Sequence, residues 1–153
     1  MDAKKLYIAY GSNLNLAQMA HRCPTARVIG ATSMKDWRLL FKGPHGGAVA
    51  TVEPSKGAGV PVLMWEITEA DEAALDRYEG WPYLYHKETV EIELNGKTVK
   101  AMVYIMNEGR PLGQPNSYYY SVIFDGYKAA GFDVEILRQA TEDSIETEEV
   151  RYE

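Results

Sequence analysis

The sequence is poor in cysteine, with Cys23 as the single one among 153 residues. One cysteine cannot form a disulfide within the chain, and this usage is typical of a reducing compartment. Long apolar runs are also missing. The N-terminal LYIAY (6–10) is too short for the core of a signal peptide or for a membrane span. The sequence therefore predicts a cytoplasmic protein that does not contact membranes.

Basic residues are outnumbered, with 16 Lys and Arg against 22 Asp and Glu, a net charge of −6 and an isoelectric point near 5.1. An acidic surface repels phosphate backbones, and no local cluster of Lys and Arg reverses this. We therefore expect no nucleic-acid partner.

Motifs for metals and nucleotides are missing as well. The three histidines, His21, His45 and His86, and the lone cysteine show no CxxC, HxxxH or HExxH spacing. The chain has neither a Walker pattern nor G-x-G-x-x-G. These absences predict no metal and no cofactor.

The composition that is present is ordinary for a globular protein, with 46% apolar and 25% charged residues, although 11 tyrosines are many. A chain of this length can bury roughly two-thirds of its unfolded surface. We expect one domain over 1–153, with an acidic tail from about residue 141.

The apolar spacing predicts an α+β fold: a small, mostly antiparallel β-barrel flanked by helices. Asn95-Gly96 between two alternating segments is a strong hairpin signal. Thr68 is a suitable N-cap and Gly80 a suitable C-terminal glycine for the clearest helix. We expect strands at 5–10, twice within 27–42, at 46–54, 60–67, 85–94 and 97–106, a turn at 55–59, and helices at 16–23, 68–80, 117–132 and 133–140.

The first predicted strand runs directly into Gly11-Ser12-Asn13. Successive backbone N–H groups in such a turn can form an anion-binding nest, and the following helix adds the positive end of its dipole. Gly11 permits a positive φ and close approach of a ligand, and Ser12 and Asn13 add side-chain donors. The alternative is a plain strand-to-helix turn capped by Ser12 or Asn13.

Glu79 ends an amphipathic helix, where the dipole disfavours a carboxylate. Asp76 adds like-charge repulsion, and Tyr78 and Trp81 are placed to desolvate the group. All three effects raise the pKa toward the range useful for proton transfer. The alternative is an exposed carboxylate that is tolerated at small cost.

Four segments together carry a resemblance: Tyr10-Gly11-Ser12-Asn13, HGGAVATV (45–52), LDRYEGW (75–81) and PNSYYYSVIFDGYKAAGF (115–132). In this order they resemble the γ-glutamyl cyclotransferase superfamily, from about Leu6 to about Phe132. The resemblance implies a small antiparallel barrel and a reaction without cofactor. In that reaction the α-amine of a γ-glutamyl amide attacks its own γ-carbonyl, releasing 5-oxoproline and a free amine.

The resemblance also assigns site residues. It places the acid/base carboxylate on Glu79 and a substrate-contacting tyrosine on Tyr119. It places a substrate-binding loop on Tyr7, Ile8, Ala9, Tyr10, Gly11 and Ser12, to which Asn13 is added as a donor.

The identity of the leaving amine stays open. Trp81, Tyr83 and Tyr85 are placed to shape that side of a pocket, and His45 is a candidate donor with a structural alternative. Glutathione, γ-glutamyl amino acids and other γ-glutamyl amines all remain possible. Two further alternatives are a non-catalytic small-ligand binding protein and an enzyme that removes a γ-glutamyl group from a biosynthetic intermediate. The oligomeric state is left open.

Overall fold

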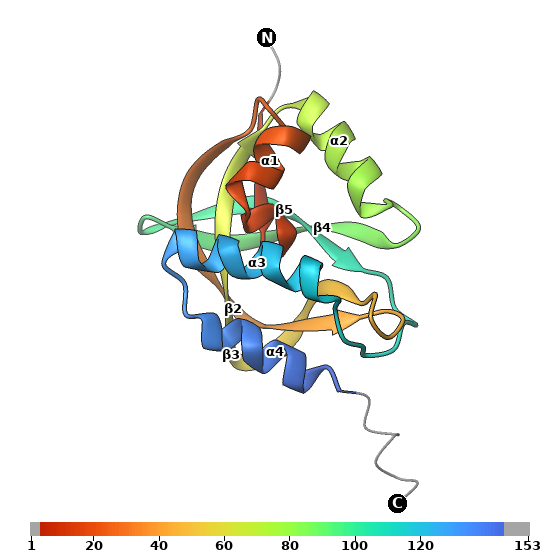
Figure 1. Cartoon of the computed structure of the whole chain (residues 1–153). Helices are drawn as coiled ribbons and strands as arrows, with labels where there is room; N and C mark the ends of the chain where they lie inside the picture. Colours follow the sequence, from red (N-terminus) through yellow and green to blue (C-terminus); the bar gives the residue numbers. More distant parts are fainter. Residues whose placement is uncertain (1–3, 146–153) are drawn as a thin grey trace, which may run out of the picture.

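The computed structural model of the chain describes residues 4–145 (Figure 1). Its strands and helices belong to the predicted α+β class, with pairs of strands following one another along the chain. In order they are β1 (Lys5–Ala9), a 3-10 turn η1 (Ser12–Leu14), α1 (Leu16–Arg22), β2 (Arg27–Lys42), β3 (Val49–Ile67), α2 (Glu69–Glu79), β4 (Tyr85–Leu94), β5 (Lys97–Met106), α3 (Ser117–Ala130) and α4 (Val134–Asp143).

One five-stranded sheet has the order β2-β3-β1-β5-β4. The β1 strand is central, antiparallel to β3 and parallel to β5. Two expectations were therefore wrong: the sheet is mixed rather than mostly antiparallel, and it is open rather than closed into a barrel. The outer strands β2 and β4 approach each other without pairing: the Thr32 hydroxyl donates to the Glu93 backbone carbonyl at 2.6 Å, and the Lys35 ammonium lies 3.9 Å from the Glu93 carboxylate.

The prediction differs most from the structure in the two longest strands, β2 and β3. Residues 55–59 were predicted to form a turn, but β3 continues through them and pairs with β2 from Lys42↔Val49 to Arg27↔Glu66. The ladder changes register between Lys35 and Trp37. There the Asp36 carboxylate accepts from the Gly57 N–H at 2.9 Å. A bulge lets a long hairpin bend without ending, so Gly57 and Gly59 mark a bend in the hairpin and not a turn between strands.

The predicted ends of α2 are confirmed. Thr68 forms a capping box with Asp71, and Gly80 adopts the left-handed conformation with φ 67°. The predicted hairpin also forms, with Leu94 paired to Lys97 across Asn95-Gly96.

The core lies between the sheet and the helices α1, α3 and α4, which cover one face in Figure 1. Helix α2 follows β3 and leads into β4, so that its C-terminal end lies beside the sheet near β4. Helix α4 continues to Asp143, past the expected start of the acidic tail. The remainder of that segment, 146–153, lies outside the described residues.

Candidate active site

A small pocket opens where β1 ends, and its roughly 300 Å³ of empty space includes solvent outside the mouth. It brings together segments that are far apart in the sequence. Ala9 is buried in the sheet and does not line the pocket. All the other predicted site residues do: the lining is Tyr7, Ile8, Tyr10, Gly11, Ser12, Asn13, Ala50, Glu79, Tyr85, Tyr104 and Tyr119.

The turn after β1 supplies main-chain donors. Leu14 N–H bonds to the Gly11 carbonyl and Asn15 N–H to the Ser12 carbonyl, both at 3.0 Å. The first N–H groups of such a turn have no acceptor within it, which leaves those of Ser12 and Asn13 available to a ligand.

Gly11 is required for a reason other than the expected one. Its φ is −124°, so the turn does not use a positive φ. A Cβ at Gly11 would lie 3.2 Å from the Ala50 Cβ and 3.7 Å from the Tyr119 hydroxyl. The glycine is needed because the turn passes so close to β3.

The polar side chains of the turn bond to protein groups. Asn13 is buried, and its amide donates to the Tyr7 hydroxyl at 2.8 Å while its carbonyl oxygen accepts from Arg22. The Ser12 hydroxyl is 2.7 Å from the Tyr78 hydroxyl, which links the turn to α2. Asn13 therefore orients Tyr7, and one of its two amide protons is used in that bond.

Tyrosine hydroxyls form much of the wall. Tyr10 donates to the Tyr104 carbonyl at 2.7 Å, and Tyr85 donates to the Ala50 carbonyl at 2.6 Å. The Tyr119 hydroxyl accepts from the Ala50 N–H at 3.0 Å, which leaves its own proton free to donate. Burial raises the pKa values of these tyrosines well above the ordinary value, so they act as neutral donors.

Glu79 is the acidic residue of this lining. Its side chain forms none of the hydrogen bonds found within residues 4–145. Burial raises the pKa of Glu79 to about 7, and the Arg22 guanidinium opposes that rise. A carboxyl with this pKa can accept and return a proton near neutral pH.

The cause of this shift differs in part from the sequence argument. The Asp76 carboxylate is turned away to Lys87 and Tyr104, and it does not contribute to the raised pKa of Glu79. Trp81 lies under the Lys87 ammonium, 4.1 Å from ring centre to nitrogen, outside the pocket lining. Enclosure by the pocket walls, rather than Asp76 or Trp81, therefore causes most of the rise in the pKa of Glu79.

Arg22 was missed by sequence reasoning. Its guanidinium carbon lies 3.4 Å above the Tyr78 ring, and the group donates to Asn13 and to the Gln18 carbonyl oxygen. Tyr104 and Ala50 were also missed as lining residues. Ala50 lies within the HGGAVATV segment, which was the available signal, whereas nothing local marked Arg22 or Tyr104.

The remaining candidate residues differ in whether they line the pocket. Tyr85 lines the pocket, whereas Tyr83 is 87% exposed and lies outside it. His45 lines a different hollow, with Pro111 and Gln114 among its neighbours. Cys23 is buried, and burial raises its pKa to about 11, as expected for an unreactive thiol.

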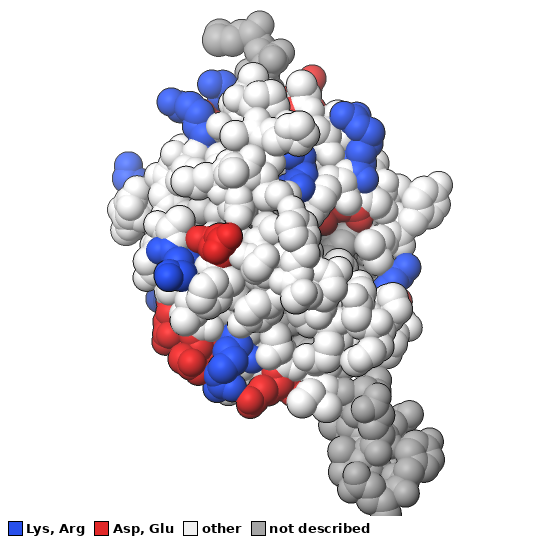
Figure 2. All heavy atoms as spheres, in the orientation of Figure 1, with Lys and Arg blue, Asp and Glu red and all other residues white. Residues whose placement is uncertain are grey.

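Within residues 4–145, no three His, Cys, Asp or Glu side chains gather where a metal ion could be held. No helix in that range is long and apolar enough to cross a membrane. On the face shown in Figure 2, Lys and Arg are scattered and interspersed with acidic side chains, rather than gathered into one patch.

Comparison with known proteins bears on the family. The family model described as "Gamma-glutamyl cyclotransferase, AIG2-like" matches residues 7–122. The chain belongs to this family. The resemblance drawn from YGSN and LDRYEG is thereby confirmed.

Curated relatives and solved structures agree with that membership. The chain is 29% identical to bovine gamma-glutamylcyclotransferase over 144 residues, covering 88% of this chain and 76% of the relative. It is 29% identical to the human protein of that name over 142 residues, covering 85% and 73%. A solved structure named gamma-glutamyl cyclotransferase superposes with a TM-score of 0.77 at 27% identity, covering 90% of this chain and 86% of the other.

A more distant structure shares the fold alone. The protein YkqA from Bacillus subtilis superposes with a TM-score of 0.78 at 18% identity, covering 94% of this chain and 56% of its own. The open mixed sheet with its helices is thus the architecture of a wider group of proteins.

Proposed function

We propose that this chain is a gamma-glutamylcyclotransferase, which converts a γ-glutamyl amide into 5-oxoproline and a free amine or amino acid. The observation that carries the proposal is Glu79: an acid without a hydrogen-bond partner among residues 4–145, with its pKa raised to about 7, in the pocket that Ser12 and Asn13 also line. The curated relatives bear the same name.

The chemistry needs few catalytic groups. Nucleophile and electrophile belong to one molecule and close a five-membered ring, so their effective concentration is already high. The α-ammonium must lose a proton before attack, and the leaving nitrogen must gain one. Glu79 would take the first proton and deliver the second, because its pKa lets it hold or release a proton at small cost.

The turn and the tyrosines would hold the substrate. Carboxylate and oxyanion both need hydrogen-bond donors, and the N–H groups of Ser12 and Asn13 supply them at the pocket wall. The free proton of Tyr119 adds a donor close to Gly11. Tyr85 would limit the space for the leaving amine.

The amine itself, the place in glutathione metabolism and the compartment belong to the same proposal. A single buried cysteine supports a reducing, cytoplasmic setting. No observation favours a non-catalytic binding protein or removal of a γ-glutamyl group from an intermediate over turnover of simple γ-glutamyl amines.

The test is a panel of γ-glutamyl compounds assayed for 5-oxoproline release with the wild-type chain and Glu79→Gln. The panel contains glutathione, γ-glutamyl amino acids and γ-glutamyl amines. We expect release from at least one compound and a loss of a hundredfold or more in Glu79→Gln, roughly the contribution of general acid–base catalysis.

Glu69→Gln is the matched control, because Glu69 is an exposed acid on the same helix. It should retain full activity. Near-normal 5-oxoproline release by Glu79→Gln would falsify the role of Glu79. Ligand binding without turnover by the wild-type chain would instead identify a binding protein.

A further inference from the structure

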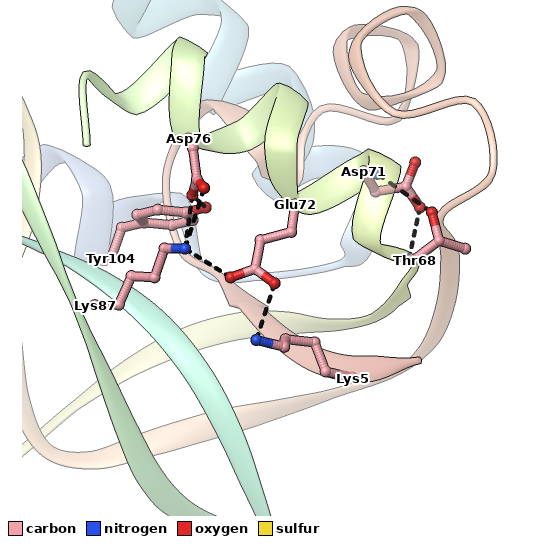
Figure 3. A network of polar contacts seen from close by, with 7 residues as sticks. All are labelled: Lys5, Thr68, Asp71, Glu72, Asp76, Lys87 and Tyr104. Atoms are coloured by element: carbon pink, nitrogen blue, oxygen red, sulfur yellow. Dashed lines mark hydrogen bonds and ion pairs between the residues drawn. The ribbon is translucent and has the colours of Figure 1, made fainter. Parts of the chain in front are cut away.

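A polar network fastens α2 to three strands of the sheet (Figure 3). The Lys87 ammonium of β4 lies 2.7 Å from Glu72 and 2.9 Å from Asp76, on successive turns of α2. The Lys5 ammonium of β1 lies 2.9 Å from Glu72. The Tyr104 hydroxyl of β5 donates to Asp76 at 2.6 Å.

Three of these charges are partly buried. The side chains of Lys87, Glu72 and Asp76 are 23%, 15% and 22% exposed. Burial lowers the pKa of Lys87, but the hydrogen bonds to Glu72 and Asp76 outweigh it and raise that pKa. Removing Lys87 would take one of the two partners from each partly buried carboxylate, leaving Glu72 with Lys5 and Asp76 with the Tyr104 hydroxyl, so the network constrains geometry more than an exposed ion pair does.

Helix α2 has few apolar contacts that could hold it against the sheet. Leu75 is its only fully buried apolar side chain, and Ala74 is partly buried. Tyr78 is 43% exposed. With one strong apolar anchor over 11 residues, the position of α2 depends on its polar contacts.

The network adjoins the pocket at two points. Asp76 lies one turn before Glu79 on the same helix. Tyr104 is part of the pocket wall, with its ring edge-on to Tyr7 at 5.9 Å between centroids and its carbonyl bonded to Tyr10. The Asp76–Tyr104 bond therefore joins the helix that carries the acid to the wall that the acid faces.

We propose that Lys87 is a positioning residue: by binding Glu72 and Asp76 together, it holds α2 against the sheet so that the Glu79 carboxyl stays in the pocket. The inference rests on the proposed function, because the rate measurements below assay that activity. It assigns to Lys87 no contact with the substrate.

The first test is a double-mutant cycle of Lys87→Met and Asp76→Asn, assayed for 5-oxoproline release. Each single variant should lower kcat by roughly ten- to hundredfold, since small misplacement of a reacting group has effects of this order. The double variant should lose less than the product of the two single losses, because Lys87 and Asp76 share one contact while each keeps a further partner. Lys87→Arg should restore most of the rate.

Two measurements separate positioning from partial unfolding. The stoichiometry of 5-oxoproline binding, by calorimetry, should stay at one per chain with KM changed less than about threefold, because the turn after β1 is untouched. Lys42→Met is the matched control, since Lys42 is 22% exposed and pairs with Glu53 away from the pocket. It should leave kcat unchanged.

A test that does not require turnover follows the titration of Glu79 by carbon NMR, assigned with Glu79→Gln. The Lys87→Met/Asp76→Asn variant loses one charge of each sign, so their direct effects on Glu79 largely cancel. Its Glu79 pKa should fall from about 7 toward the ordinary value as the carboxyl gains water. Tyr104→Phe should act in the same direction with a smaller effect.

The outcomes are distinct. Additive losses in the cycle, a Lys87→Met variant that behaves like Lys42→Met, or a Glu79 pKa that stays near 7 in the double variant each overturn the inference. Absence of 5-oxoproline release by the wild-type chain overturns the proposed function instead, and the NMR titration then still decides the role of Lys87.

Discussion

Glu79 is the residue for which function and stability oppose each other. Burial raises its folded pKa to about 7, above the ordinary carboxyl value of roughly 4.3 in an unfolded chain. The folded state therefore holds a proton more tightly. The stability that this contributes is fully present below about pH 4 and is lost as the pH rises through 7.

Glu79→Gln removes this pH dependence and should be more stable than the wild-type chain at high pH. The free energy of unfolding of Glu79→Gln minus that of the wild-type chain should be larger at pH 8 than at pH 4.5, by up to about 3 kcal/mol. Urea unfolding of both proteins at the two pH values measures this, because every other group titrates alike in the pair. An equal difference at both pH values would show that the folded pKa is not raised.

Tyr119 offers a second test at this scale, since its hydroxyl both accepts from Ala50 and faces the pocket. Tyr119→Phe should lower kcat/KM by about tenfold, the effect of one lost hydrogen bond to substrate. The adjacent Tyr118 is 71% exposed, and its hydroxyl lies outside the pocket lining. Tyr118→Phe should therefore match the wild-type rate, and an equal loss in both variants would remove Tyr119 from the site.

Individual site residues could be predicted where the sequence carries a local or family signal. Gly11 and Glu79 have such signals, and both line the pocket. Arg22 and Tyr104 could not be found, because their positions depend on packing between elements far apart in the chain. The same holds for the partners of Asn13 and Asp76, which lie on other elements of the fold.

At the scale of elements, the end of α2 sets the direction in which the chain leaves Glu79. Gly80 and Gly131 end α2 and α3 in the same left-handed conformation, with φ of 67° and 77°. A Cβ at Gly80 would lie 3.3 Å from the Leu84 Cβ, whereas one at Gly131 meets nothing within 4 Å. The two glycines thus form a matched pair.

Gly80→Ala and Gly131→Ala should each lose about 1 kcal/mol of stability, the usual cost of a side chain in this conformation. Only Gly80→Ala should also lower kcat, because its strain adjoins Glu79. Thermal unfolding and 5-oxoproline release measure the two effects. Equal activity in the two variants would mean that the geometry of this cap does not matter to the acid.

Elements defined by local chemistry were predictable from the sequence. The Thr68 cap, the Gly80 stop and the Asn95-Gly96 hairpin need only neighbouring residues, and all three formed. The turn expected at 55–59 failed for a physical reason. Glycines also permit a bulge, and the choice between bulge and turn depends on pairing with β2, which begins at residue 27.

At the scale of the whole molecule, the N-terminal turn is held from outside by the later helix α3. A Cβ at Gly126 would lie 2.8 Å from the carbonyl carbon of Leu14 and 3.0 Å from the Asn15 nitrogen. The Asn15 amide also donates to the Val122 carbonyl at 3.0 Å. Helix α3 therefore packs backbone to backbone against the end of the Ser12–Leu14 turn.

Gly126→Ala should cost about 1–3 kcal/mol of stability despite the better helix propensity of alanine, because the backbone must move apart. The displaced turn should also raise KM. Asp125→Ala, at an exposed position of the same helix, controls for propensity and should change neither quantity appreciably. Stability gained by Gly126→Ala would contradict the close contact.

The global topology was only partly predictable. The α+β class follows from the element pattern, but closure into a barrel depends on the stagger of strands that are distant in sequence. The parallel β1–β5 pair joins residues 7 and 102, and no local signal reports it. The contact of Thr32 with Glu93 brings the two sheet edges together without a ladder.

The pKa of Glu79 has a consequence for a population of molecules. With a pKa of about 7, both the protonated and the deprotonated forms of Glu79 are populated near neutral pH. In the proposed mechanism only the deprotonated form of Glu79 can take the first proton, so a lower pH would reduce the fraction of molecules able to start the reaction. The rate of the proposed reaction would then depend on pH through the single side chain of Glu79.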